Sequence, residues 1–323
     1  MQNAIYNIIH DMSQCLSMSD LKELQRVLIK YLVDEEHIKK NTTSNRDYLR
    51  LFVESKSVEG LSKETLHYYG KGIEEFLRYI NVPLAQVTTE HIRDYLAQYP
   101  KRHQCSRATL DLHRRYLSTF FSWLYEEDYI IRNPIKRVHK IKSEQKLKTV
   151  LSDEDVEVLR DSCKNLRNHA IVDLLYSSGM RVGEIRLLNI DDIDFEKKEC
   201  VIFGKGSKER TAYFDARTKI HLKKYLESRT DTNEALFVSV KKPHQRLERN
   251  TYETILREMG KELGINKVHP HKFRRSMATK AIDKGMPIEQ VQRILGHSEI
   301  NTTMTYAMVN QNNVKQSYHK LFS

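Results

Sequence analysis

The chain has 323 residues, a formal net charge of +11 and a pI of about 9.3. This length predicts two domains, each large enough to bury a core, and a charged fraction of 30% beside 39% hydrophobic residues is typical of a soluble, ordered, helix-leaning protein. No apolar run is long enough to cross a bilayer, which excludes a membrane-spanning protein. The positive charge favours a polyanionic partner, although charge alone does not identify nucleic acid.

The cysteines and the N-terminus indicate the compartment. The four cysteines form no CxxC pair and lie near no metal-binding histidine cluster, so we expect reduced thiols and no metal site. They are Cys15, Cys105, Cys163 and Cys200. The N-terminus lacks the basic and apolar regions of a signal peptide. We therefore expect the protein in the cytoplasm, or on the nucleoid if its partner is DNA.

Residues 1–42 are predicted to form a helical N-terminal extension. Apolar residues at helical spacing indicate two helices, the second of them capped near Ser19 and Asp20. The apolar stripe of the second helix needs a partner surface, which is either the rest of the chain or another subunit.

Residues 43–131 are predicted to form a bundle of four helices. Aromatic residues of the last helix recur at helical spacing, which a packed core explains better than a ligand site. The expected helix caps are Ser62, Thr88 or Thr89, and Ser106.

Residues 132–150 are predicted to link this bundle to a second domain, after Asn133–Pro134 has ended it. Between residues 101 and 148 there are twelve Lys or Arg against five Asp or Glu. The two interpretations are a solvated charged linker and a strap that crosses DNA phosphates. The motifs described next favour the strap.

Residues 151–323 are predicted to form a mixed α+β domain. Helices come first, a β-hairpin with strands of alternating polarity follows, and further helices complete the domain. The landmarks are a capping box at Ser152 and Asp155, a hairpin turn at Gly204–Lys205–Gly206, and a helix between Pro287 and Gly296.

Four separated segments of this domain carry basic or nucleophilic side chains. Each residue alone has an ordinary explanation, such as an exposed arginine, a turn lysine, a structural histidine, or one of 17 tyrosines. His271 and Arg274 are three residues apart and would share one helix face. The candidate site residues are Arg181, Lys205, His271, Arg274, His297 and Tyr306.

Together these groups suit attack on a phosphodiester without a metal or another cofactor. Arginine forks neutralise the non-bridging oxygens as charge builds on phosphorus, and such donors contribute about 3–4 kcal/mol each. A tyrosine with a pKa of about 10 must lose its proton as it attacks, and a histidine can accept that proton. A lysine can protonate the departing 5′-oxygen, and the phosphotyrosine conserves the bond energy for religation.

Four motifs occur in a fixed order, SGMRVGEIRLL, VIFGKGSKER, HPHKFRRSMAT and LGHSEINTTMTYAMV, between residues 178 and 309. In this order and spacing they closely resemble the tyrosine recombinase (phage integrase) family, over about residues 45–323. The resemblance implies a SAM-like, all-α core-binding domain over residues 43–131 and a catalytic domain over residues 151–323. Residues 1–42 match no element of the family, and its small β-rich arm-binding domain is not apparent.

The resemblance also implies a role for each candidate residue. Arg181 and Arg274 would bind the scissile phosphate, and His297 would hydrogen-bond it. Tyr306 would be the nucleophile that attacks the phosphorus.

Two further roles concern protons. Lys205 would be the general acid for the leaving 5′-hydroxyl, with Lys208 in the same turn as the alternative. His271 would assist proton transfer. The family often has histidine where this chain has Arg275, at a position that the chemistry does not require.

The implied function is site-specific recombination of double-stranded DNA by a homotetramer that passes through a Holliday junction, with or without accessory proteins or a partner recombinase. The two domains would clamp opposite faces of the duplex. The alternatives are type IB topoisomerase-like relaxation of DNA and a non-catalytic basic DNA-binding protein. Apolar residues at helical spacing after Tyr306, from Val309 to Phe322, suggest a segment that docks on a neighbouring subunit.

Overall fold

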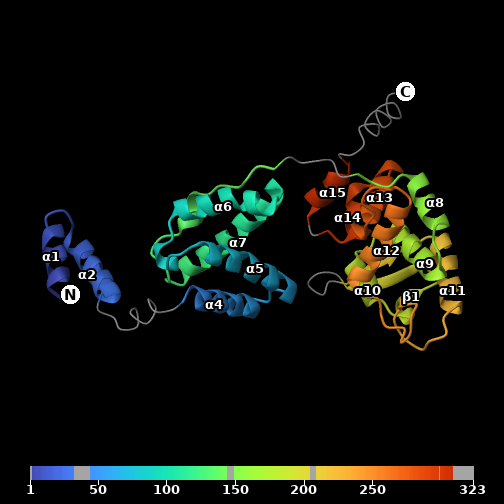
Figure 1. The fold of residues 1–323 in the computed structure, drawn as a ribbon, viewed down its shortest axis with the longest axis horizontal. Coiled ribbons are helices and arrows are strands. Elements are labelled where there is room, and N and C mark those ends of the chain that lie inside the picture. Colours follow the sequence, from blue (N-terminus) through green and yellow to red (C-terminus); the bar gives the residue numbers. More distant parts are fainter. Residues whose placement is uncertain (1, 33–43, 144–148, 204–208, 298, 308–323) are drawn as a thin grey trace, which may run out of the picture. The chain divides into compact units, whose positions relative to one another are not determined.

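The computed structural model describes residues 2–32, 44–143, 149–203, 209–297 and 299–307. The chain divides into two compact units, Met1–Gln145 and Lys146–Ser323 (Figure 1). The described part of the first unit is helical, and the second unit combines helices with a three-stranded sheet. The expectation of an all-α bundle followed by a mixed α+β domain is confirmed.

The two predicted helices near the N-terminus are present as α1 (Gln2–Met12) and α2 (Met18–Leu32), and they pack on each other. The cap of α2 lies earlier than expected. Ser17 Oγ accepts a hydrogen bond from the backbone N–H of Asp20 at 3.3 Å. Ser19 and Asp20 therefore lie inside the first turn, and Ser17 supplies the capping oxygen.

Four longer helices complete the described part of the first unit. Their first turns are capped by side-chain oxygens, which confirms Ser62 and Ser106 and selects Thr88 over Thr89. Thr89 instead donates its hydroxyl to the backbone oxygen of Pro134 at 2.7 Å. The elements are α4 (Asn45–Val58), α5 (Lys63–Tyr79), α6 (Thr89–His103) and α7 (Arg107–Glu126), with 3-10 turns η1 (Leu84–Gln86) and η2 (Pro134–Arg137).

Aromatic rings fill the core of this bundle. The ring of Phe52 stands edge-on to those of Phe120 and Trp123, with centroids 5.3 and 5.5 Å away. The predicted aromatic core is therefore confirmed. The bundle extends past its predicted end at Asn133–Pro134, because Ile135 in η2 is buried in the same core.

The second unit opens with the predicted capping box. Ser152 Oγ accepts from the backbone N–H of Asp155, and the Asp155 carboxylate accepts from the backbone N–H of Ser152, both at 3.0 Å. The helices of this unit are α8 (Asp153–Asp161), α9 (Leu166–Ser178), α10 (Val182–Leu187), α11 (Ala216–Glu227), α12 (Arg249–Glu262), α13 (Pro270–Asp283), α14 (Ile288–Leu295) and α15 (Ile300–Ala307), with a 3-10 turn η3 (Ile190–Asp192).

A small antiparallel sheet follows α10, with strand order β1-β2-β3. Strands β2 (Glu199–Phe203) and β3 (Glu209–Tyr213) form the predicted hairpin, with Phe203 opposite Glu209. A strand that the sequence did not predict, β1 (Ile193–Asp194), pairs with β2. The predicted turn around Lys205 lies outside the described residues.

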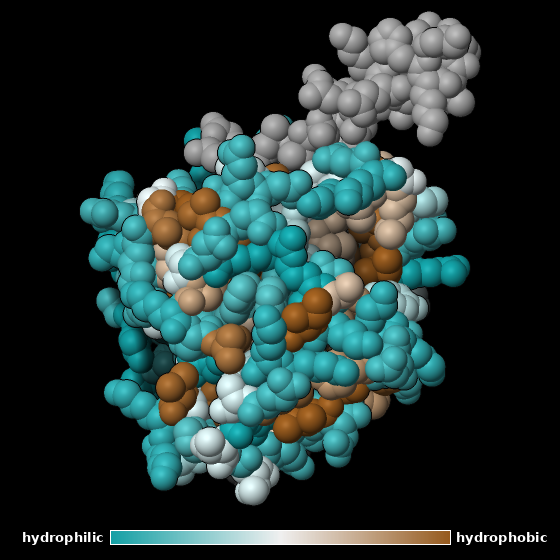
Figure 2. All heavy atoms as spheres, turned by 90° about the vertical axis from the view of Figure 1, so that its right-hand side faces the viewer, coloured by the Kyte–Doolittle hydropathy of each residue, from teal (hydrophilic) through white to brown (hydrophobic). Residues whose placement is uncertain are grey.

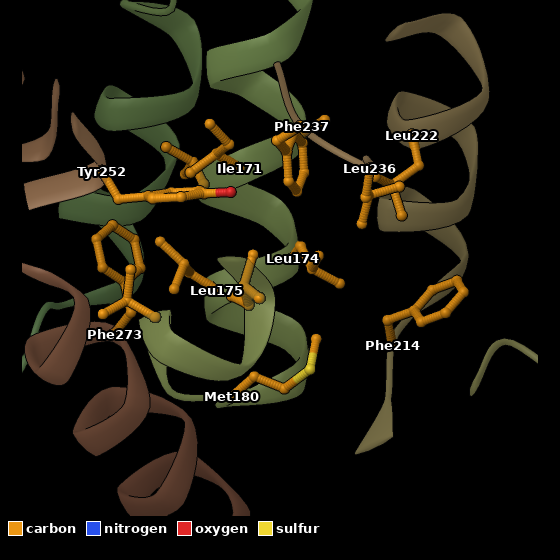
Figure 3. Packing of buried hydrophobic residues seen from close by; sticks show 14 of the residues in the cluster. Ile171, Leu174, Leu175, Met180, Phe214, Leu222, Leu236, Phe237, Tyr252 and Phe273 are labelled. Carbon is orange, nitrogen blue, oxygen red and sulfur yellow. The ribbon is translucent and has the colours of Figure 1, made fainter. Parts of the chain in front are cut away.

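Helix α9 lies in the core of the second unit. Residues 170–175 are at most 1% exposed, so this helix has no solvent-exposed face along that stretch. Figure 3 shows Ile171, Leu174 and Leu175 of α9 among Phe237, Tyr252, Phe273 and the other labelled core side chains. This close packing makes α9 a fixed support for the turn at its C-terminal end, where the candidate site begins.

The surface of the second unit is polar on the face shown in Figure 2. Hydrophilic side chains cover most of that face, and apolar side chains form small separate patches. Among the described residues, no helix combines the length and the apolar character that crossing a bilayer requires.

Candidate active site

Arg181 lies in the turn between α9 and α10. Gly179 ends α9 with a φ of +60°, and a Cβ at Gly179 would collide with the Met277 side chain, 2.2 Å away. The chain then places Arg181 at the N-cap of α10. The Glu184 carboxylate accepts from the backbone N–H of Arg181 at 2.8 Å and from its guanidinium at 2.9 Å. One acid thus fixes both the backbone and the charge of Arg181.

Arg274 is a buried arginine of α13, only 2% exposed. Its guanidinium donates to the backbone oxygens of Gly179, at 2.7 Å, and Leu295, at 2.5 Å. Burial, followed by the charge of Arg181, lowers the pKa of Arg274 to about 10. The group stays protonated near neutral pH, and backbone carbonyls rather than a carboxylate hold it in place.

The turn after α14 brings the two arginines together. Gly296 ends α14 with a φ of +63°, as predicted for a glycine just past a helix. Arg181 donates to the backbone oxygens of Leu295, at 3.5 Å, and Gly296, at 3.3 Å. Because Arg274 donates to the same Leu295 oxygen, two distant arginines are oriented by one turn.

His297 follows this turn and is half-buried. Its Nδ1 lies 2.8 Å from Oγ1 of the fully buried Thr303, which fixes the orientation of the ring. Burial, followed by the charges of Arg274 and Arg181, lowers the pKa of His297 to about 4. The imidazole is therefore neutral at neutral pH and can act as a hydrogen-bonding group.

Tyr306 lies on α15, next to His297. The two ring centroids are 5.9 Å apart, and the half-buried Tyr306 packs against the small apolar cluster of Ala278, Val291 and Leu295. Helix α15 packs on both α13 and α14, which carry Arg274 and the turn with Gly296. The described part of α15 thus brings the tyrosine to the arginine pair.

His271 lines an open pocket of about 330 Å³ together with Arg181, Arg249 and Phe203. Partial burial, followed by the charge of Arg274 and then Arg249, lowers the pKa of His271. The neutral imidazole can accept a proton. A concave pocket lined by two arginines suits an anionic group.

Lys205 and its alternative Lys208 lie outside the described residues. Phe203, the last described residue of β2, lines the pocket that contains Arg181 and His271. Strand β2 therefore ends at the pocket, and the segment that contains both lysines follows directly in the sequence.

Sequence reasoning missed two residues of this region, Glu184 and Arg210. The Glu184 carboxylate accepts from Arg181 and also from Arg210 of β3, at 2.8 Å. Its spacing of three residues after Arg181 is that of a capping box, which was the available signal. Nothing local in the sequence distinguishes Arg210, because its partners come from other elements.

One group of potential metal ligands lies elsewhere among the described residues, on α9 and α11. It consists of His169, Asp173 and His221. The Asp173 carboxylate already pairs with the buried Arg160 at 2.5 Å and hydrogen-bonds His221. We interpret this group as an ion-pair network, because a guanidinium already balances the carboxylate.

Comparisons with known proteins identify the family. The family described as "Phage integrase family" matches residues 149–313, and "Phage integrase, N-terminal SAM-like domain" matches residues 48–131. The Tyrosine recombinase XerD of Oceanobacillus iheyensis is 31% identical over 280 residues, which cover 80% of this chain and 93% of that protein. The Tyrosine recombinase XerA of Pyrococcus furiosus is 33% identical over 284 residues, which cover 86% and 95%.

Solved structures share the fold. The XerH site-specific recombinase bound to palindromic difH substrate aligns with a TM-score of 0.68 at 21% identity, over 97% of this chain and 93% of that one. A lambda integrase dimer bound to a COC′ core site aligns with a TM-score of 0.68 at 19% identity, over 88% and 85%. Both the SAM-like helical domain and the catalytic domain are thus accounted for. The chain belongs to the phage integrase family, and it is a tyrosine recombinase, an enzyme of site-specific recombination.

Proposed function

We propose that this recombinase cleaves double-stranded DNA at a specific site by transferring the scissile phosphate to Tyr306. The observation that carries the proposal is the convergence of Arg181 and Arg274 on one turn, beside His297 and Tyr306. Solved structures of the same fold include complexes with DNA, which agrees with a DNA substrate.

The scissile phosphate is bound by the two arginines. Their guanidinium groups carry positive charge that Glu184 balances only in part, and they neutralise the non-bridging oxygens as the phosphorus becomes pentacoordinate. The neutral His297 hydrogen-bonds one of these oxygens. Each of these contacts strengthens as negative charge builds in the transition state.

The reaction exchanges one phosphate ester for another. The Tyr306 oxygen forms a bond to phosphorus and loses its proton with the assistance of His271, whose pKa is lowered. The bond from phosphorus to the 5′-oxygen breaks, and the bonding electrons go to that oxygen, which takes a proton from Lys205. A 5′-hydroxyl of another strand then attacks the 3′-phosphotyrosine, reverses these steps and releases Tyr306.

The assembly is part of the proposal. Residues 43–131 and 151–323 grip the duplex, the basic segment 132–150 crosses phosphates between them, and residues 1–42 form an extension. A homotetramer joins two sites and exchanges strands through a Holliday junction, with or without accessory proteins or a partner recombinase. We further propose that the segment after Tyr306, of which residues 308–323 lie outside the described residues, docks on a neighbouring subunit, so deleting residues after Met308 should impair synapsis and cleavage.

The nucleophile is tested by a covalent adduct. Purified protein is incubated with nicked suicide substrates from the DNA that flanks its gene, and denatured in SDS. We expect a DNA-linked band that Tyr306→Phe removes while DNA binding persists, and that the exposed-residue control Tyr125→Phe retains. A band that survives Tyr306→Phe would reassign the nucleophile. Relaxation of supercoiled DNA at no preferred site would instead favour the topoisomerase-like activity.

The general acid is tested by changing the leaving group. Lys205→Ala should cleave ordinary DNA poorly and recover on a substrate with a bridging 5′-sulfur, because a thiolate leaves without protonation. Lys208→Ala is the matched control from the same turn and should cleave both substrates. If Lys208→Ala shows the loss and the recovery instead, Lys208 is the acid.

A further inference from the structure

Arg210 is a largely buried arginine of β3 that has no part in the reaction as proposed above. Its side chain is 12% exposed. One end of its guanidinium donates to the Glu184 carboxylate at 2.8 Å, and the other end donates to the backbone oxygen of Ile294. A single side chain therefore joins strand β3 to α10 and to the last turn of α14.

Glu184 links Arg210 to Arg181, because its carboxylate accepts hydrogen bonds from both arginines. Glu184 Oε2 accepts from Arg210 and from the backbone N–H of Arg181, and Oε1 accepts from the Arg181 guanidinium at 2.9 Å. The Glu184 side chain is 5% exposed, so water screens these ion pairs little. Without Arg210 the carboxylate loses one of its two anchoring guanidinium groups, and the position of Arg181 is less restricted.

Arg210 also packs against the turn that orients both phosphate-binding arginines. A Cβ on Gly296 would lie 2.7 Å from Cδ and Nε of Arg210, so the arginine lies directly against this backbone. The Gly296 oxygen accepts from Arg181, and the preceding Leu295 oxygen accepts from Arg274. Among the described residues, the buried Nε of Arg210 has no hydrogen-bond partner. The side chain of Arg210 is held instead by its hydrogen bonds to Glu184 and Ile294 and by its packing against Gly296.

We propose that Arg210 is a positioning residue for strand cleavage, holding Arg181 and the turn at Leu295–Gly296 in the geometry that receives the scissile phosphate. The proposal rests on the proposed function, because it assumes that Arg181 binds the phosphate. Arg210 acts through Arg181, since it is buried against Glu184 and Gly296. A displacement of about 1 Å at a reacting group can lower a rate by about 10²-fold. We therefore expect Arg210→Met to cleave about 10²-fold more slowly.

The test compares three suicide substrates under single-turnover conditions. The first has an ordinary scissile phosphodiester, the second a neutral methylphosphonate, and the third a bridging 5′-sulfur. Arg210→Met removes the charge, and Arg210→Lys keeps a charge but cannot reach both partners. Arg217→Met is the matched control, because it breaks an ion pair with Glu157 at 2.9 Å in the same unit.

The expected pattern is specific to the phosphate. The cleavage rate of Arg210→Met falls about 10²-fold on the phosphodiester and only a few-fold on the methylphosphonate. The neutral linkage has less negative charge for Arg181 to neutralise, so the position of Arg181 matters less. The 5′-sulfur does not restore cleavage, Arg210→Lys is intermediate, and Arg217→Met behaves as the wild type. Equal losses on the phosphodiester and the methylphosphonate would indicate general disruption and overturn the proposal. Recovery on the 5′-sulfur substrate would also overturn it, because Arg210 would then act on the leaving group through the hairpin.

A double-mutant cycle tests the route through Glu184. Arg210→Met should add little to the loss caused by Glu184→Gln, since both changes break one chain of contacts, whereas independent losses that multiply would contradict that route. Non-covalent DNA binding and the urea unfolding midpoint show that each variant is folded. If the wild type forms no Tyr306-dependent adduct, the proposed function fails. If the wild type forms the adduct and Arg210→Met forms it equally fast, only the role of Arg210 fails.

Discussion

Among the described residues of the second unit, two clusters of buried charge differ in how their charges are balanced. The first, which we name the phosphate-site cluster, consists of Arg181, Glu184, Arg210 and Arg274. The second, which we name the α9 cluster, consists of Arg160, His169, Asp173 and His221. Both lie against the same apolar core, so the difference between them comes from their own partners.

In the α9 cluster the single arginine, Arg160, is balanced by acids. Arg160 pairs with Asp173 and Glu157, both at 2.5 Å. Burial alone would lower the pKa of Arg160, but the two carboxylates outweigh burial and raise it. The positive charge of Arg160 is therefore balanced by carboxylates of the protein itself.

In the phosphate-site cluster the positive charge is in excess. Glu184 is shared by Arg181 and Arg210, and Arg274 is held by carbonyls. Burial lowers the pKa of both Arg210 and Arg274. An uncompensated buried charge costs folding free energy, and it persists where a bound anion provides the missing partner. The comparison therefore distinguishes a cluster whose arginine is balanced within the protein from one with excess positive charge, which is what the proposed phosphate site requires.

The largest expected effect is on cleavage. Arg274→Gln should lower single-turnover cleavage by about 10³-fold, because a buried donor to the phosphate is lost. Arg160→Gln, in the balanced cluster, should cleave as fast as the wild type per folded molecule. Adduct formation on suicide substrates measures both. If Arg274→Gln cleaves at the wild-type rate, the excess positive charge of the phosphate-site cluster does not contribute to cleavage at the phosphate.

The second effect is on stability, and here the α9 cluster is the one expected to show the large loss. Arg160→Gln leaves the buried Asp173 without its guanidinium and should lower the free energy of unfolding by about 3–5 kcal/mol. Arg217→Gln breaks a solvent-exposed pair with Glu157 and should cost at most about 1 kcal/mol. Urea unfolding at neutral pH compares the two. Equal losses of unfolding free energy in the two variants would show that burial of the Arg160–Asp173 pair does not increase its contribution to stability.

The sequence predicted those parts of the fold that depend on local pattern. The capping box at Ser152, the helix that ends at Gly296 and the β2–β3 hairpin follow from spacing and turn residues. Strand β1 was missed because two residues are too short to show alternation. The cap of α2 was misplaced because three neighbouring residues, Ser17, Ser19 and Asp20, all have side chains that can cap.

The candidate site was predicted from family motifs rather than from spacing. No periodicity indicates that Arg181 and Arg274 meet at the oxygen of Leu295, because that contact depends on how α10, α13 and α14 pack. Arg210 was missed for the same reason, since its partners Glu184 and Ile294 come from distant segments. The motif resemblance supplied the residues, and only the packing supplied their arrangement.

The third prediction concerns pH. The pKa of His297 falls from its ordinary value of about 6.5 to about 4 in the folded chain. Between these values the unfolded chain binds more protons, so the free energy of unfolding falls as the pH falls through this window. Because the ring is only half-buried, solvent screening keeps the contribution of His297 below the value of about 3 kcal/mol that the full shift would give. His297→Gln should flatten this part of the pH–stability curve, and an unchanged curve would contradict the lowered pKa of His297.

The smallest expected effect tests the excess charge directly. If the phosphate-site cluster lacks an anion, inorganic phosphate should stabilise the DNA-free chain by about 1 kcal/mol at a concentration several times its Kd, which corresponds to a Tm increase of about 2–4 °C. Chloride at equal ionic strength controls for screening. Arg274→Gln should lose the increase, whereas Arg160→Gln should keep it although its own Tm is lower. The same increase in both variants would mean that phosphate binds elsewhere, and the two clusters would then not differ in their demand for an anion.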